Sequence, residues 1–155
     1  METSLIGKAL DFGTRECRFE PYVSNLVLKS SIRVISSYNI SVKKKKPISL
    51  NNLNKGALRF LKKLYKLGIL NSFSFNTPKR TARTHPAYYN GMPYVSNLRP
   101  LAAKTSSFTI SLGGLSLLKK YSGLSVVLIQ SNKGIMTIHE SINTKTSGSL
   151  FAVAS

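Results

Sequence analysis

The chain has 155 residues, of which 42% are hydrophobic and 18% charged, so it can bury a core and does not have the composition of a disordered chain. Its 23 lysine and arginine residues stand against five acids, the formal net charge is +18, and nothing acidic occurs from Pro21 to His139. The natural counter-charge is a phosphate backbone, whereas the single cysteine, Cys17, excludes an intrachain disulfide and a cysteine metal cluster.

Membrane-spanning and cleaved targeting segments are also poorly supported by the sequence. The longest apolar runs, such as Leu124 to Ile129, are far shorter than the roughly 18 residues that cross a bilayer. Four of the five acids lie within the first 20 residues, whereas an import presequence is typically rich in arginine and poor in acids. We therefore expect residues 1–21 to be an N-terminal extension rather than a cleaved leader.

The segment from Tyr22 to Ile35 has apolar residues at roughly helical spacing, which predicts a helix, although its many β-branched residues leave a strand open. Four consecutive lysines and Pro47 follow it. Four like charges cannot all be buried and a proline breaks a continuing element, so we expect an exposed basic loop here. The four lysines of this run are Lys43, Lys44, Lys45 and Lys46.

An amphipathic helix is expected from about Leu50 to Leu67. Its apolar residues recur every three or four positions, and basic residues occupy much of the remaining circumference. Ser49 is suited to cap the start of this helix, and Gly68 sits where a helix ends. The alternation from Ile69 to Phe75 then predicts a short strand.

The stretch from Asn76 to Pro86 is expected to be a long exposed loop, because it is polar, basic and contains two prolines. Tyr88 and Tyr89 precede Asn90-Gly91, which is a hairpin-type turn signal. We place a domain boundary close to Gly91.

The last third of the chain is expected to be α+β. A turn at Lys133-Gly134 and a short helix at Leu115–Tyr121 are predicted among its strands. The predicted strands are Tyr94–Leu98, Phe108–Leu112, Leu124–Ile129, Ile135–Thr137 and Leu150–Ala154.

The run from Gly123 to Thr137, followed by Ser147 to Ser155, resembles the C-terminal signature of the small-subunit ribosomal protein eight family. In that family a strand ends in a Ser-Thr-Ser-Lys-Gly-x-Met-Thr loop, and a Gly-Gly-Glu precedes the last strand. The residues that match directly are Lys133, Gly134, Met136, Thr137 and Gly148.

Upstream, Pro47, the amphipathic helix, Gly68-Ile69, the Tyr-Tyr-Asn-Gly turn and Asn97-Leu98-Arg99 have family counterparts in the same order, so the resemblance covers Tyr22 to Ser155. Three segments depart from the family pattern. Gln130-Ser131-Asn132 stands for its Ser-Thr-Ser, Ser147-Gly148-Ser149 for its Gly-Gly-Glu, and Ile138-His139 for its Asp-Arg. Such drift is typical of an organellar member.

The resemblance implies a fold of α/β and α+β type in two small domains. These are an N-terminal α-β-α-β-β domain over residues 22–91 and a C-terminal α+β rRNA-binding domain over residues 92–155. The family supplies a structural constituent of the small ribosomal subunit, which binds an irregular stem in the central domain of the rRNA, supports subunit assembly and translation, and contacts ribosomal protein five. We expect a mitochondrial ribosome, with a plastid or a bacterial cytoplasmic ribosome as alternatives, and no cofactor, membrane or small-molecule substrate.

The candidate RNA-binding residues fall into two groups. Short hydroxyl and amide side chains beside a glycine can reach base edges and 2′-hydroxyl groups in a shallow groove, and lysines attract phosphate without reading sequence. The first group is Ser131, Asn132, Lys133, Gly134, Thr137 and Ser149, and the second is Lys104, Lys43, Lys44, Lys45 and Lys46.

Each of these patterns also has a purely structural interpretation. Asn-Lys-Gly is ordinary turn chemistry, and most lysine runs are solvated loops. Tyr88, Tyr89 and Tyr94 could stack on bases, but tyrosines at strand positions are more often core residues or cross-strand pairs, which we favour here.

An enzyme is not expected. The body of the chain has no paired carboxylates, its only imidazoles are His85 and His139, and it lacks glycine-rich nucleotide-binding motifs. The alternative function is a free-standing basic protein that binds DNA or a membrane surface. A helix-turn-helix would need a second helix soon after Gly68, where Ile69 to Phe75 predicts a strand instead.

Overall fold

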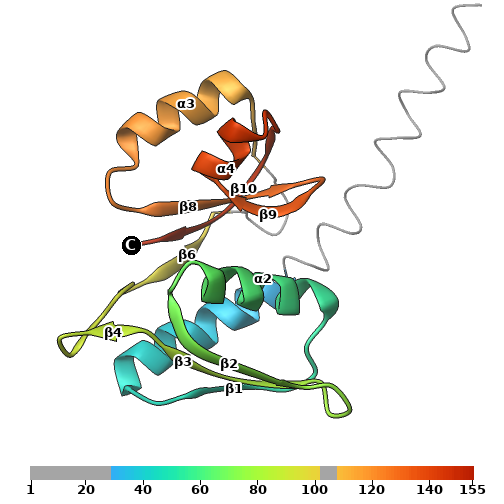
Figure 1. Ribbon diagram of the computed structural model, residues 1–155, viewed down its shortest axis with the longest axis vertical. Helices are drawn as coiled ribbons and strands as arrows, with labels where there is room; N and C mark the ends of the chain where they lie inside the picture. The colour runs from blue at the N-terminus through green and yellow to red at the C-terminus, as the bar shows by residue number, and fades with distance from the viewer. Residues whose placement is uncertain (1–28, 102–107) are drawn as a thin grey trace, which may run out of the picture.

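The computed structural model describes residues 29–101 and 108–155, arranged in four stacked layers (Figure 1). From one end to the other these are two C-terminal helices, the C-terminal sheet, two N-terminal helices and the N-terminal sheet. The expected mixed α/β fold with N-terminal and C-terminal parts is confirmed. The extension over residues 1–21, the predicted helical residues 22–28 and Lys104 lie outside the described residues.

The N-terminal part has the expected order α-β-α-β-β. A helix over residues 29–44 is followed by β1 (Ile48–Leu50), α2 (Lys55–Lys66), β2 (Leu70–Asn76) and β3 (Thr81–Pro86). The three strands form an antiparallel sheet in the order β1-β3-β2, and both helices lie on one side of it (Figure 1).

Two helix boundaries differ from the prediction. The first helix continues past Ile35 to residue 44, so Lys43 and Lys44 lie in its last turn, and the chain leaves the helix at Lys45, which has a φ of +52°. The second helix begins at Lys55 and not at Leu50, because Ile48–Leu50 pairs with β3 as a strand. Its N-cap is Asn54 rather than Ser49.

The prediction of a loop from Asn76 to Pro86 was wrong. Thr81–Pro86 is the central strand of the N-terminal sheet, joined to β2 by a tight turn. Its buried residues are Ala82, Thr84 and Pro86, and the alternating residues Arg83 and His85 are exposed. A half-buried strand whose exposed residues are basic has the composition of a loop, which explains the error.

The predicted hairpin at Asn90-Gly91 is confirmed. It joins β4 (Tyr88–Tyr89) to β5 (Met92–Pro93), and Asn90 and Gly91 have φ values of +49° and +80°. Two consecutive residues with positive φ are characteristic of the two-residue turns that match the twist of paired strands. The predicted domain boundary therefore falls on the tip of a hairpin.

The C-terminal part is built around an antiparallel sheet in the order β6-β10-β8-β9, with β7 also paired to β10. Two helices cover one face of this sheet (Figure 1). The elements are β6 (Leu98–Pro100), β7 (Thr109–Ile110), α3 (Leu112–Tyr121), β8 (Val126–Ser131), β9 (Gly134–Thr137), α4 (Ile138–Asn143) and β10 (Gly148–Ala154).

The C-terminal elements are close to those predicted, with three corrections. The strand expected at Tyr94–Leu98 begins only at Leu98, and the one expected at Phe108–Leu112 is limited to Thr109–Ile110. Ser111 ends that strand because its side chain caps α3, accepting a hydrogen bond from the backbone N–H of Gly114. The sequence reasoning did not predict α4.

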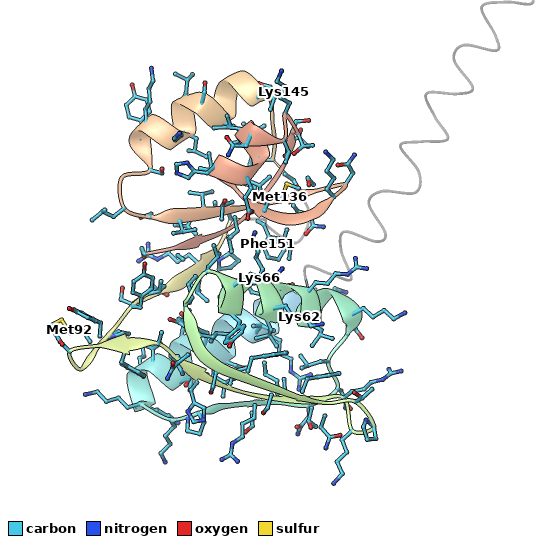
Figure 2. All side chains as sticks on the ribbon, in the orientation of Figure 1. Lys62, Lys66, Met92, Met136, Lys145 and Phe151 are labelled. Carbon is cyan, nitrogen blue, oxygen red and sulfur yellow. The ribbon has the colours of Figure 1, made fainter. Side chains whose placement is uncertain are left out.

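One hydrophobic cluster joins the two parts. It includes Phe60 and Leu61 of α2 together with Leu128 of β8 and Phe151 of β10. The register of β10 shifts between Leu150 and Ala152, and the rings of Phe151 and Phe60 form a T-shaped contact at a centroid distance of 5.2 Å. Phe151 lies between the C-terminal sheet and α2 in Figure 2.

Polar contacts hold the same junction. The buried hydroxyl of Tyr38, in the first helix, donates to the carbonyl oxygen of Val95 at 2.9 Å. The side chain of Asn39 donates to the carbonyl of Leu98 and accepts from its backbone N–H. The first helix therefore fixes the segment that leads from the hairpin into the C-terminal sheet.

Candidate nucleic-acid interface

The β8–β9 turn consists of Ser131, Asn132, Lys133 and Gly134, and Ser131 pairs with Gly134. The hydroxyl of Ser131 accepts from the backbone N–H of Lys133 at 3.2 Å and donates to the carbonyl oxygen of Gly134 at 3.1 Å. Gly134 has a φ of +112°, a conformation that other residues rarely adopt. Ser131 and Gly134 thus shape the turn.

Asn132 and Lys133 are exposed at the tip of this turn. Their side chains are the ones that can reach a partner without breaking a bond within the turn. An exposed amide can both donate and accept hydrogen bonds, and a lysine supplies three donors and a charge. The structure therefore divides the predicted residues of the turn into two that present side chains and two that position them.

Thr137 is the last residue of β9 and caps α4. Its hydroxyl accepts from the backbone N–H of Glu140 at 3.3 Å, and the Glu140 carboxylate accepts from the backbone N–H of Thr137 at 2.9 Å. Thr137 is only 9% exposed. Its position indicates support of the α4 start, and an RNA contact by its side chain stays a prediction.

Ser149 lies on β10 directly opposite Gln130 of β8. Gln130 is the residue immediately before the β8–β9 turn. A side chain at the preceding residue, Gly148, would approach the carbonyl oxygen of Gln130 to 2.5 Å, so glycine is required for the two strands to pair here. The structure thus brings Ser149 next to the strand that carries the turn.

Gln130 is a polar residue near the turn that sequence reasoning treated only as a departure from the family pattern. Its side-chain oxygen is buried and has no hydrogen-bond partner among the described residues. An unpaired buried acceptor is costly, which makes Gln130 a further candidate contact for a donor on a bound molecule. The position of Gln130 immediately before the predicted turn is the sequence feature that could have identified it as a candidate contact.

The lysine run is exposed but lies apart from the turn. All four residues from Lys43 to Lys46 are exposed, two in the last turn of the first helix and two beyond it. Figure 1 shows this helix end beside the N-terminal sheet, whereas the β8–β9 turn projects from the C-terminal sheet. The two predicted groups therefore belong to different surfaces.

The basic residues of α2 also form a surface. Figure 2 shows Lys62 and Lys66 on this helix, in the layer next to the C-terminal sheet. Both are exposed, as are Lys55 and Arg59. The apolar side of the helix, with Phe60 and Leu64, is fully buried.

Lys63 of α2 is an exception, because it is largely buried and pairs with Glu140 at the start of α4. Partial burial alone raises the pKa of the Glu140 carboxyl, but hydrogen bonds from Lys63 and from the backbone N–H of Thr137 outweigh it. The pKa of Glu140 therefore lies below its usual value of 4.5. Glu140 is the only acidic side chain in the described part of the chain, so the other lysines and arginines there have no further carboxylate side chain to pair with.

Residues 29–101 and 108–155 contain no group of three or more metal-ligating side chains that could hold an ion, and no helix in these ranges is long and apolar enough to cross a membrane. In comparisons with known proteins, no family model and no curated protein matches the chain.

Proposed function

We propose that the chain is a structural protein of the small ribosomal subunit that binds a folded rRNA stem. The observation that carries the proposal is the β8–β9 turn. It presents Asn132 and Lys133 on a backbone fixed by Ser131 and Gly134. The described residues around it include a single acidic side chain. A narrow, rigid turn with an amide and an ammonium group suits the wide, shallow minor groove of an RNA helix.

The motif resemblance makes this proposal more specific. It favours a stem in the central domain of the rRNA as the ligand, ribosomal protein five as a neighbour, and support of subunit assembly and translation as the role. The degree of drift favours a mitochondrial ribosome over a plastid or bacterial one. In this proposal the chain catalyses no reaction and uses no cofactor.

The experiment is sedimentation of ribosomes purified from the source organelle, followed by mass spectrometry of each fraction. We expect the chain to travel with the small subunit, and the recombinant protein to prefer the central-domain stem over a scrambled stem of equal length. Recovery with DNA or with lipid, and equal affinity for both stems, would instead support a free-standing basic protein.

A further inference from the structure

The N-terminal sheet has a second face, opposite the two helices, that no other described element covers (Figure 1). We call it the outer sheet face. Strand pairing places Ser49, Arg83 and Ser74 side by side across its three strands, with His85 next to Ser72 in the adjacent row. All five of these residues are exposed.

The chemistry of this face is uniform. Apart from Arg83 and His85 its exposed side chains are short hydroxyls and amides, and none of the large exposed hydrophobic residues lies on β1, β2 or β3. An open groove lies over the part of this face next to the β2–β3 turn, and its lining includes Ser49, Ser74, Arg83 and the half-buried Phe75.

Basic residues stand at both ends of the outer sheet face. Lys45 and Lys46 precede β1 at one end, and Lys79 and Arg80 form the β2–β3 turn at the other. The backbone N–H of Leu53 donates to the carbonyl of Arg80 at 3.0 Å, which fixes this turn beside the end of β1. The six residues of β3 between the two ends span about 20 Å.

We propose that the outer sheet face binds the ribose–phosphate backbone of a second RNA segment, separate from the one at the β8–β9 turn. Arg83 contacts a phosphate at the centre of the face, and the basic residues at its two ends contact phosphates further along the RNA chain. The serine and asparagine side chains are suited to exchange hydrogen bonds with 2′-hydroxyl groups. The inference rests on the proposal that the chain binds RNA, and it adds a second site.

A polyanion fits this face better than a protein partner does. Protein interfaces have apolar cores enriched in large aromatic side chains, whereas the aromatic ring in this groove, Phe75, is half-buried and packs against the hydrophobic core. The Arg83 guanidinium has no ion-pair partner among the described residues, so it is available to an external anion. Phosphate recognition by arginine needs no further apolar surface.

The test uses the full-length chain saturated with an rRNA stem, to which fluorescent oligouridine containing 4-thiouridine is added. We expect the oligouridine to bind at the same time and to cross-link to β1 or β3. Arg83→Ala should weaken oligouridine binding about tenfold, because one charge-assisted hydrogen bond is lost. Arg83→Lys should restore part of it.

Arg99→Ala is the matched control, since Arg99 is an exposed strand arginine on the C-terminal sheet. It should leave oligouridine binding nearly unchanged. Equal losses in the Arg83 and Arg99 variants, displacement of oligouridine by the stem, or equally tight binding of polyglutamate would each overturn the inference. If the stem fails to bind while oligouridine still cross-links to β1 or β3, the proposed function fails and the outer-face site stands.

Discussion

The β8–β9 turn permits a prediction that separates specific recognition of the RNA stem from non-specific electrostatic attraction. Asn132→Ala removes an exposed amide without changing the charge or any bond that shapes the turn. Each hydrogen bond lost to the stem should cost about 1 kcal/mol, which is roughly a fivefold loss of affinity. The affinity for a scrambled stem should stay the same, so the discrimination between the two stems should fall by this factor.

Lys133→Ala should behave differently, because lysine acts mainly on phosphate. We expect both stems to be weakened alike, and the slope of log affinity against log salt to fall by roughly 0.7 to 0.9 for the phosphate no longer neutralised. Ser131→Ala removes two hydrogen bonds within the turn and should lower the free energy of unfolding by roughly 1 to 3 kcal/mol.

Fluorescence titration of both stems over a range of salt concentrations measures the RNA effects, and urea denaturation measures stability. The reasoning would be refuted by an Asn132→Ala protein that keeps full discrimination and a native circular-dichroism spectrum. A larger loss of discrimination in Lys133→Ala than in Asn132→Ala would refute it equally.

Three further predictions concern stability. Phe151→Ala should lower the free energy of unfolding by about 3 to 5 kcal/mol, because it leaves a cavity next to Phe60 at the junction of the two parts. Urea denaturation should still show one transition, and two transitions would contradict a shared core. Tyr38→Phe should cost about 1 to 3 kcal/mol by leaving the Val95 carbonyl unpaired. Burial, and to a smaller extent the nearby Tyr88, raises the pKa of Tyr38 to about 12. The unfolded chain therefore loses this proton before the folded one, so native stability should fall as the pH rises above the usual 10.0, and the phenylalanine variant should show a smaller decline. Because the pKa of Glu140 is lowered in the folded protein, ionised Glu140 stabilises the fold above the usual 4.5, and this stabilisation is lost as the pH falls through the folded-state pKa. The free energy of unfolding of Glu140→Gln should therefore decline less steeply with falling pH than that of the native protein.

The features predictable from the sequence are those set by nearby residues. The apolar period of α2 and the positive-φ chemistry of Asn90-Gly91 depend on short stretches of chain, and both were predicted. The C-terminal helix α4 could have been predicted as well. Thr137 and Glu140 have the spacing of a capping box, and this signal was overlooked.

Other features depend on partners far along the chain. Strand β3 is recognisable only from its neighbours β1 and β2, because its own exposed residues are polar. The local sequence does not distinguish the adjacent lysines Lys62 and Lys63, yet Lys63 is largely buried and pairs with Glu140, which lies beside it in the fold. Within the candidate site, the sequence identified the residues of the turn, but only the pairing of β8 with β9 shows that Ser131 shapes it.

The hydrophobic cluster at the junction has a consequence for the order of folding during synthesis. Strand β10 follows every other described element, and it supplies Phe151, Ala152 and Ala154 to a cluster that also contains residues of the first helix. The apolar side of α2 that receives Phe151 therefore stays partly uncovered until β10 has been translated. Nascent chains with exposed apolar surface are prone to aggregate, so the N-terminal part stays vulnerable to aggregation for longer than an independently folding domain would.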